Sequence, residues 1–307
     1  MKPCFLKYII IFLFCSAAVN GIAQSRMPEV KIAPRQPEKT AKDSLDFEER
    51  PYFLLIEQSE KALEEGNYDA AALRLVEAMS VEPNNELNVA LLSNLGMIYF
   101  YNEQDSMALV VLDKAIERSP RLIAPREGRA RILLNKGFDK DAYDEYANIL
   151  EIDSTNVEAR FIHGMMSLYA GNLPVALDDI KMLEKLVPTN TKTLLAKATL
   201  YSMTGKELEA ISLFRNLIES DPAPEYFARL AACQLAIDRL GEASETIGTA
   251  LDKYPTDAEL FYYRAILNKK RYLLDDAQKD ARRAIELGAD KRKVLKIFEE
   301  PGASDNG

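Results

Sequence analysis

The sequence predicts an all-α solenoid of about seven helix-turn-helix repeats that ends in a C-terminal capping helix. The first observation is a set of alanines that recur at a nearly constant spacing: Ala71, Ala108, Ala142, Ala176, Ala210, Ala243 and Ala277. The second is a constant frame, in which a small residue stands twelve positions before each alanine and an apolar residue seven positions after it. A period of about 34 residues is typical of stacked helix hairpins, in which a single repeat cannot bury its apolar face alone.

The small residues of the frame mark the predicted crossing point of the two helices in each hairpin. They are Ser59, Gly96, Ala130, Gly164, Ala198, Ala231 and Ala265. The apolar residues that follow the alanines are Ala78, Ala115, Ile149, Leu183, Leu217, Ala250 and Ala284. Small side chains let two helix backbones approach closely, and a bulkier residue there would cost about 1–3 kcal/mol of packing energy.

Glycine and proline mark the predicted turns. The turn inside the hairpin falls on Gly66, Gly137, Gly171 and Gly205, whereas Glu103, Asp238 and Tyr272 take that place in the other three repeats. Five repeats close with a proline that cannot continue a helix: Pro83, Pro120, Pro188, Pro222 and Pro255. Ser154 and Ala289 stand at the closing position of the remaining two repeats.

These residues resemble the tetratricopeptide repeat. The segment 89–122 matches that pattern with Leu92, Leu95, Gly96, Tyr99, Ala108, Leu112, Ala115 and Pro120, and the segment 157–190 matches it with Gly164, Gly171, Ala176, Ile180, Leu183 and Pro188. The resemblance covers residues 52 to about 291 and implies a right-handed superhelical solenoid. We place the repeats near 52–85, 89–122, 123–156, 157–190, 191–224, 224–257 and 258–291, within an array that spans 49–291.

The capping helix is predicted after the seventh repeat, over residues 292–300 in a segment that begins at Lys291. Its apolar residues, Val294, Leu295, Ile297 and Phe298, would cover the last open face of the array. The tail 301–307 is expected to be disordered.

The resemblance implies a binding groove on the concave side, lined by the first helix of each hairpin. Transferred to this chain, the groove positions carry Met97, Phe100, Tyr101, Arg131, Phe161, Met165, Leu168, Tyr169, Leu195, Met203, Tyr262 and Ile266. Methionine and aromatic side chains suit adaptable binding of an apolar peptide or helix. The alternative is that many of them pack against the neighbouring repeat.

The carboxylate clamp of the chaperone-adaptor members of the family is absent. Those members carry Lys and Asn at successive groove positions, whereas position 5 of the first three repeats here holds Ile56, Ser93 and Glu127. An acidic ligand tail is therefore not expected, except at Arg131.

Residues 1–23 are predicted to form a secretory signal peptide. Lys2 and Lys7 precede an apolar run from Tyr8 to Val19, and Gly21 and Ala23 suit cleavage before Gln24. The run is shorter than the roughly 20 residues that span a bilayer, although an uncleaved anchor is the alternative. Phe14 before Cys15 argues against lipid attachment. Residues 24–48, rich in proline and charge, are expected to form a flexible leader.

Net charge argues against nucleic acid as a partner. The formal charge is −9, and it becomes −11 when the signal is removed, because that segment holds two lysines and no acids. An acidic surface repels phosphate. The main basic cluster is Arg118, Arg121, Arg126, Arg129 and Arg131. Pairing with neighbouring carboxylates is the favoured interpretation of this cluster, and docking of an acidic peptide is the alternative.

The sequence offers no catalytic constellation, metal site or cofactor motif. His163 is the one imidazole in the chain and occupies a packing position, so a structural role is expected. Cys233 is the one cysteine left after signal removal, and it is expected to be a buried, small apolar residue. The aspartates in the pairs 178–179 and 275–276 are expected to be solvated.

The resulting prediction is a non-catalytic interaction scaffold, secreted or periplasmic in a bacterium, that binds an apolar or amphipathic segment of a partner protein. Two alternatives remain. One is an assembly or export factor of an outer-membrane complex. The other is an accessory substrate-binding or sugar-binding protein, which would normally use tryptophan, and the chain has none. No cofactor and no nucleic acid are expected, and the sequence leaves the oligomeric state open.

Overall fold

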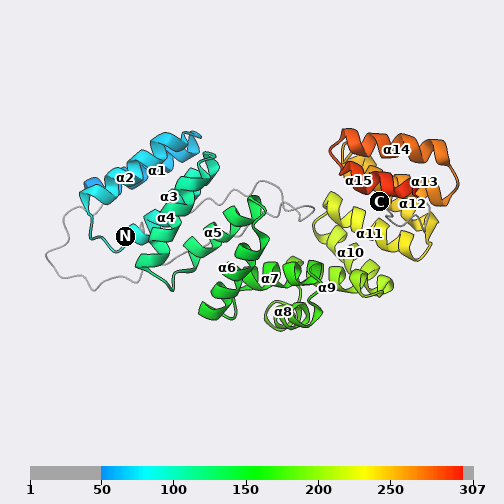
Figure 1. Ribbon diagram of the computed structural model, residues 1–307, viewed down its shortest axis with the longest axis horizontal. Helices are drawn as coiled ribbons and strands as arrows, with labels where there is room; N and C mark the ends of the chain where they lie inside the picture. The colour runs from blue at the N-terminus through cyan, green and yellow to red at the C-terminus, as the bar shows by residue number, and fades with distance from the viewer. Residues whose placement is uncertain (1–49, 300–307) are drawn as a thin grey trace, which may run out of the picture. The chain divides into compact units, whose positions relative to one another are not determined.

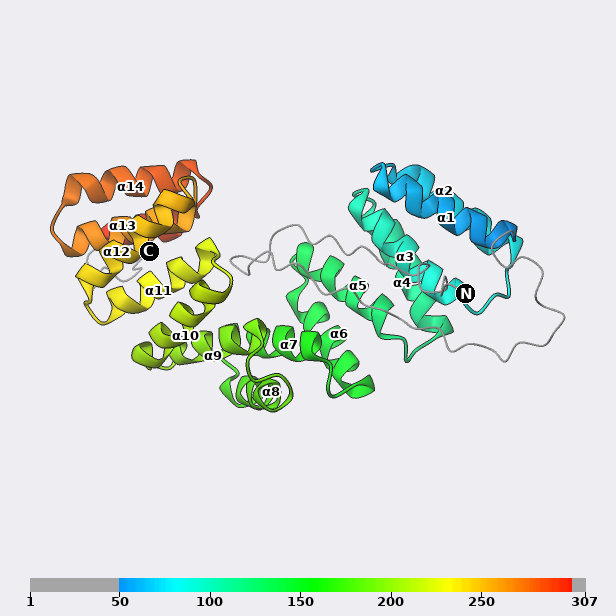
Figure 2. The same ribbon diagram turned by 180° about the vertical axis from the view of Figure 1, so that it is seen from behind.

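The computed structural model describes residues 50–299 of the chain as helices joined by short turns (Figures 1 and 2). The predicted signal peptide, the whole leader, residue 300 of the predicted capping helix and the tail lie outside these residues. The chain divides into two compact units, residues 50–159 and residues 160–299. No strand occurs within the described residues, in agreement with the predicted all-α class.

The helices of the first unit form antiparallel hairpins. They are α1 (Pro51–Glu64), α2 (Tyr68–Val81), α3 (Asn88–Tyr101), α4 (Asp105–Arg118), α5 (Ile123–Asn135) and α6 (Asp139–Ile152). In each hairpin the first helix packs on the second, and each hairpin also packs on the next one within the unit. Helix α7 (Val157–Tyr169) crosses the boundary at residue 160, lies mostly in the second unit and opens the fourth hairpin.

The second unit continues the same arrangement. Its helices are α8 (Leu173–Leu186), α9 (Thr191–Met203), α10 (Glu207–Ser220), α11 (Pro224–Ala236), α12 (Leu240–Lys253), α13 (Ala258–Lys270) and α14 (Leu274–Glu286). All five closing prolines lie between hairpins, as predicted.

The periodic small residues form the centre of each hairpin, as predicted. All seven alanines of the frame have no exposed surface, and neither do the residues seven positions after them. The crossing residues are buried too, and Ser59 donates a hydrogen bond of 2.9 Å from its hydroxyl to the carbonyl oxygen of Ala71. The repeated spacing therefore corresponds to a close contact between the two helices of each hairpin.

The predicted hairpin turns share one backbone conformation. Gly66, Gly137, Gly171 and Gly205 have φ values of 73–77°. Glu103, Asp238 and Tyr272 adopt the same left-handed region, with φ values of 59°, 54° and 61°. A residue with a Cβ atom costs roughly 1–2 kcal/mol in this region, so these three turns are strained where the others are not.

The predicted capping segment forms the short helix α15 (Lys291–Leu295) and the 3-10 turn η2 (Lys296–Phe298). Val294 and Ile297 are buried against Ala265, Ala281 and Ala284 of the last hairpin. Leu295, which the sequence suggested would help to cover the array, is 48% exposed instead. A single turn of helix presents only one face to its neighbour, and Leu295 lies beside that face.

Gly96→Ala tests the close approach of α3 and α4. A Cβ atom at this position would lie 2.5 Å from Cγ of Leu112, whose side chain is fully buried and has little room to move. We expect the substitution to lower the free energy of unfolding by about 1–3 kcal/mol in urea denaturation. Gly248→Ala is the control, because its Cβ would meet no atom within 4 Å and alanine is the better helix former. Equal effects of the two substitutions would contradict this description.

Glu60→Gln tests a pH dependence in the first hairpin. Burial, followed by repulsion from Glu57 and Glu64, raises the pKa of Glu60 from 4.5 to about 7. A raised carboxyl pKa in the folded state means that stability is lost as pH rises from about 4.5 through 7. We expect Glu60→Gln to remove a loss on the order of 1 kcal/mol, allowing for solvent screening, between pH 5 and pH 8. Thermal unfolding of both proteins at the two pH values measures this, and identical pH profiles would refute it.

Candidate functional site

Five of the twelve predicted groove residues belong to the core. Met97, Phe161, Met165, Leu168 and Leu195 are 0–7% exposed. Met97 shows why: its sulfur would lie 3.0 Å from a Cβ atom on Gly128, so it packs against the next hairpin. The alternative that the sequence left open, packing against a neighbouring repeat, therefore describes Met97, and the other four side chains are buried as well. The other seven retain accessible surface.

Phe100 and Tyr101 form part of an aromatic cluster at the end of α3. The Tyr101 ring stacks on Tyr68 of α2, with centroids 6.3 Å apart, and lies 5.6 Å from the Phe100 ring. Phe100 also packs against the buried cluster around Leu112. Both side chains are half-buried, and Arg131 of α5 is half-buried as well. This part of the surface is thus largely committed to packing.

Tyr169 and Met203 are the most accessible of the predicted groove residues in the second unit, at 50% and 48% exposure. The Tyr169 hydroxyl accepts a hydrogen bond of 3.0 Å from Arg229 of α11, sixty residues away along the chain. Arg229 also donates a hydrogen bond of 2.9 Å to Glu225. Burial opposes the charge on Arg229, but Tyr169 and Glu225 outweigh that effect and raise the pKa of its guanidinium. Tyr169 is therefore held in place while half of it faces solvent.

Tyr262 and Ile266 lie in a cavity of about 610 Å³ at the C-terminal end of the second unit. Helix α13 contributes both residues, and the opposite wall comes from α15 and η2 through Lys293, Lys296 and Ile297. In Figures 1 and 2, α13 and α14 lie together at this end of the chain. The turn between α11 and α12 closes one side of the cavity. This is the hollow into which predicted groove residues converge.

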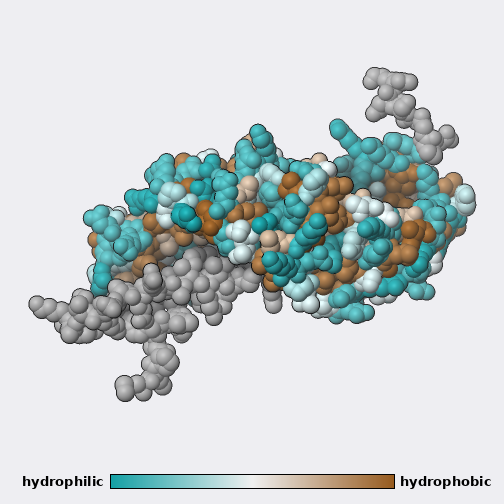
Figure 3. All heavy atoms as spheres, turned by 90° about the horizontal axis from the view of Figure 1, so that it is seen from below, coloured by the Kyte–Doolittle hydropathy of each residue, from teal (hydrophilic) through white to brown (hydrophobic). Residues whose placement is uncertain are grey.

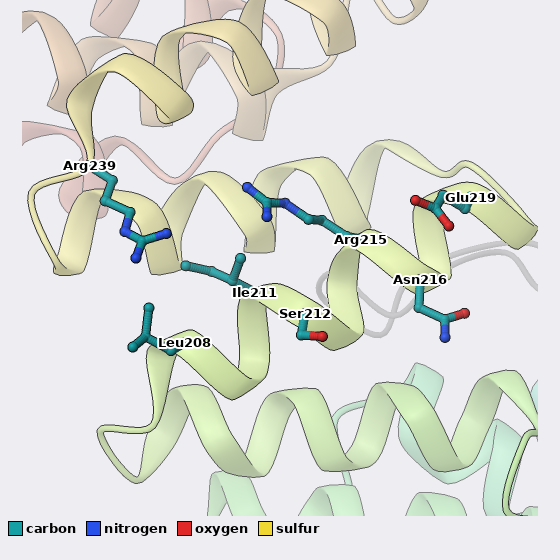
Figure 4. A pocket seen from close by; sticks show the side chains of 7 residues that line it. All are labelled: Leu208, Ile211, Ser212, Arg215, Asn216, Glu219 and Arg239. Carbon is teal, nitrogen blue, oxygen red and sulfur yellow. The ribbon is translucent and has the colours of Figure 1, made fainter.

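A second hollow, of about 390 Å³, lies on second helices and is lined mostly by polar groups. In Figure 4, Arg239 extends from the start of α12 toward Leu208 and Ile211 of α10, with Arg215 beside them. Glu242 accepts from both arginines, at 2.7 Å from Arg215 and 3.2 Å from Arg239. Both arginines therefore already have an ion-pair partner, which weakens the attraction of this hollow for an acidic ligand.

Most of the exposed large apolar side chains lie on second helices, which sequence reasoning missed. They are Leu73, Val76 and Val81 of α2, Met107 and Val110 of α4, Leu173 and Leu177 of α8, Leu208 of α10 and Leu274 of α14. Apolar patches interrupt the hydrophilic surface in Figure 3. Their exposure could have been predicted from the sequence, because these residues fall outside the periodic positions that pack between the helices.

Two of the five arginines in the cluster, Arg126 and Arg129, pair with carboxylates of neighbouring helices, which is the interpretation favoured from the sequence. Arg126 lies 3.1 Å from Glu145, and Arg129 lies 3.3 Å from Asp113 and 3.5 Å from Glu145. Glu145 is buried at 7% exposure, so its charge requires these partners.

His163 and Cys233 have the structural environments expected for them. The His163 ring contacts Asp179 at 2.6 Å, and the same carboxylate accepts a hydrogen bond of 2.6 Å from Arg160. Asp179 is 3% exposed, so the expectation that it is solvated is wrong, because the residues around it supply these partners. Burial raises the pKa of the Cys233 thiol to about 11, which keeps it protonated and unreactive. Within residues 50–299 no group of His, Cys, Asp and Glu side chains is placed to hold a metal ion.

None of the helices in the described range is both long enough and apolar enough to cross a membrane.

Comparison with known proteins supports the fold. No family model matches the chain. A tetratricopeptide repeat protein from Parabacteroides merdae has a TM-score of 0.68 at 24% identity, over 80% of this chain and 97% of that one. PilW, described as a widely conserved type IV pilus biogenesis factor, has a TM-score of 0.59 at 16% identity, over 70% of this chain and all of the other.

One curated protein also matches in sequence. Human DnaJ homolog subfamily C member 7 is 23% identical over 176 residues, which is 57% of this chain. The match spans about a third of that relative, 32% of its length. Together with the repeat geometry, these similarities identify the tetratricopeptide-repeat fold.

Proposed function

We propose that this protein, which has the tetratricopeptide-repeat fold, is a non-catalytic scaffold that binds a segment of a partner protein along its first helices. The observation that carries the proposal is the accessibility of Tyr169, Met203, Tyr262 and Ile266, which come from the first helices of three hairpins. Apolar and aromatic surface of this kind gains about 25 cal/mol per Å² when a partner covers it, less the cost of ordering that partner.

The proposal assigns partner binding to fewer residues than the twelve groove residues predicted from the sequence. Phe100, Tyr101 and Arg131 keep part of their surface and remain candidates, whereas the five core residues contribute by fixing the helices. Tyr169 is favoured as a contact because its hydroxyl is anchored on Arg229, so little side-chain entropy is lost when a ligand covers the ring.

We further propose that the protein acts in the bacterial cell envelope. The N-terminal pattern of residues 1–23 supports this, together with the fold shared with PilW, a pilus biogenesis factor. A role as an assembly or export factor of an outer-membrane complex is the second candidate, and the shared fold with PilW, a factor in pilus biogenesis, supports an assembly role.

Affinity capture tests the binding surface. The tagged full chain is crosslinked mildly in its own cells and compared with the double variant Tyr169→Ala, Met203→Ala. We expect the variant to retain less than a tenth of the partner, because two half-exposed contacts are lost while the core is untouched.

The control variant is Phe138→Ala, Met107→Ala. Its residues are 50% and 49% exposed, which matches the first pair, but they lie at a hairpin turn and on a second helix. A partner lost only in the control would place binding on the other face and refute the groove proposal.

The mature N-terminus tests export. Mass spectrometry of the chain purified from the envelope fraction should find Gln24 as the first residue. A chain that begins at Met1 and is recovered from the cytoplasm would refute the envelope proposal.

A further inference from the structure

The cavity at the C-terminal end of the second unit combines basic and aromatic side chains in a chain that is acidic overall. Four lysines line it: Lys269 and Lys270 of α13, Lys293 of α15 and Lys296 of η2. The apolar part of its wall comes from Tyr262, Ile266 and Ile297, with Tyr272 at the turn before α14. Asp238 is the one acidic residue among the described lining residues.

The charges of these lysines are only partly compensated. Lys270 lies 2.6 Å from Asp238, and Lys293 lies 3.7 Å from Glu259. Lys269 donates to the carbonyl oxygen of Ile297, which is neutral. Among residues 50–299, neither Lys269 nor Lys296 has a carboxylate within ion-pair distance. The cavity therefore carries an excess of positive charge, which favours an acidic ligand.

The aromatic residues supply a second, independent sign of a ligand. Tyr272 is 90% exposed and occupies a turn position with φ of 61°, where four other hairpins have glycine. Its ring therefore gains nothing from burial within the described chain, and its backbone is strained. The ring centroid of Tyr262, on α13, lies 4.5 Å from Nζ of Lys293. Lys293 thus covers one face of the Tyr262 ring, whereas the exposed ring of Tyr272 can take an apolar side chain between the lysines.

We propose that this cavity binds a short acidic segment of the partner protein, in which Asp or Glu carboxylates flank an apolar or aromatic residue. The carboxylates pair with Lys269 and Lys296, and the apolar residue packs on Tyr262, Ile266 and Tyr272. The inference rests on the proposed scaffold function and specifies the chemistry of its partner segment, which the sequence analysis predicted to be apolar or amphipathic.

A peptide suits the cavity better than a phosphate-bearing polymer. The basic groups are all lysines, which act as point charges and pair with single carboxylates without the fixed geometry of an arginine contact. A polyanion would also extend beyond the cavity onto a chain with a formal charge of −9. A short segment with a few carboxylates avoids that repulsion.

Peptide selection tests the proposal. A random phage-displayed library of short peptides is selected on the full chain and, in parallel, on Lys269→Gln, Lys296→Gln. We expect enrichment of peptides with Asp or Glu beside an apolar residue on the unmodified chain alone. An enriched peptide, synthesised with a fluorescent label, should bind the double variant at least tenfold more weakly in anisotropy measurements.

Two further variants separate binding from folding. The double variant Lys185→Gln, Lys253→Gln removes the same charge from exposed positions elsewhere in the second unit. It should bind the enriched peptide as tightly as the unmodified chain does. Tyr272→Gly should bind more weakly although its thermal unfolding temperature is unchanged or higher, because glycine relieves the strained turn.

The outcomes are distinguishable. Enriched peptides that are neutral or basic, or that bind both lysine variants equally, would overturn the acidic-segment assignment. If such peptides respond to Tyr169→Ala instead, the scaffold function stands and only the cavity assignment fails. If no peptide is enriched, both the scaffold function and the acidic-segment assignment fail. Sedimentation could instead show a dimer of the unmodified chain that becomes a monomer in the double variant Lys269→Gln, Lys296→Gln. That result would assign the cavity to a second copy of the chain and overturn the assignment to a partner segment.

Discussion

The close approach of two helices at a small residue is the contact on which each hairpin depends. Ala108 shows the pattern: it is fully buried, and twelve residues earlier Gly96 has no room for a Cβ atom against Leu112. Because the same contact recurs with every repeat, the first and second helices keep a constant offset. That offset decides which side chains are buried between hairpins and which remain available to a partner.

The periodic part of the molecule could be predicted from sequence because it depends on local contacts. The turn positions are an example, since Glu103, Asp238 and Tyr272 take the left-handed conformation of the glycines that they replace. The accessibility of a groove residue depends instead on the neighbouring hairpin. Leu168 and Met165 follow the groove register and yet are buried, whereas Leu295 of the capping segment is exposed. Sequence spacing places a residue on a helix face but does not reveal the size of the side chains packed opposite.

The ion pairs, like the accessibility of groove residues, depend on contacts between helices that the linear sequence does not show. Arg126 and Arg129 pair with Glu145 and Asp113. Arg215 and Arg239 share the carboxylate of Glu242. Lys269 and Lys296 meet across the last hairpin and its cap without such a carboxylate within the described range. They belong to different elements, so only the packing of the cap brings them to one cavity. The last hairpin and its cap thus place these two lysines in one cavity with the exposed ring of Tyr272.

The central claim is that partner binding uses the first-helix face and the adjoining cavity. Its most direct measurement is photo-crosslinking in the native cells, with a benzoylphenylalanine residue in place of Tyr262 in one strain and in place of Leu208, on a second helix, in another. The account predicts that Tyr262 yields a crosslink to another protein, mapped by mass spectrometry to a segment containing Asp or Glu, and that Leu208 does not. A crosslink from Leu208 alone, or one from both positions to the same segment, would contradict it.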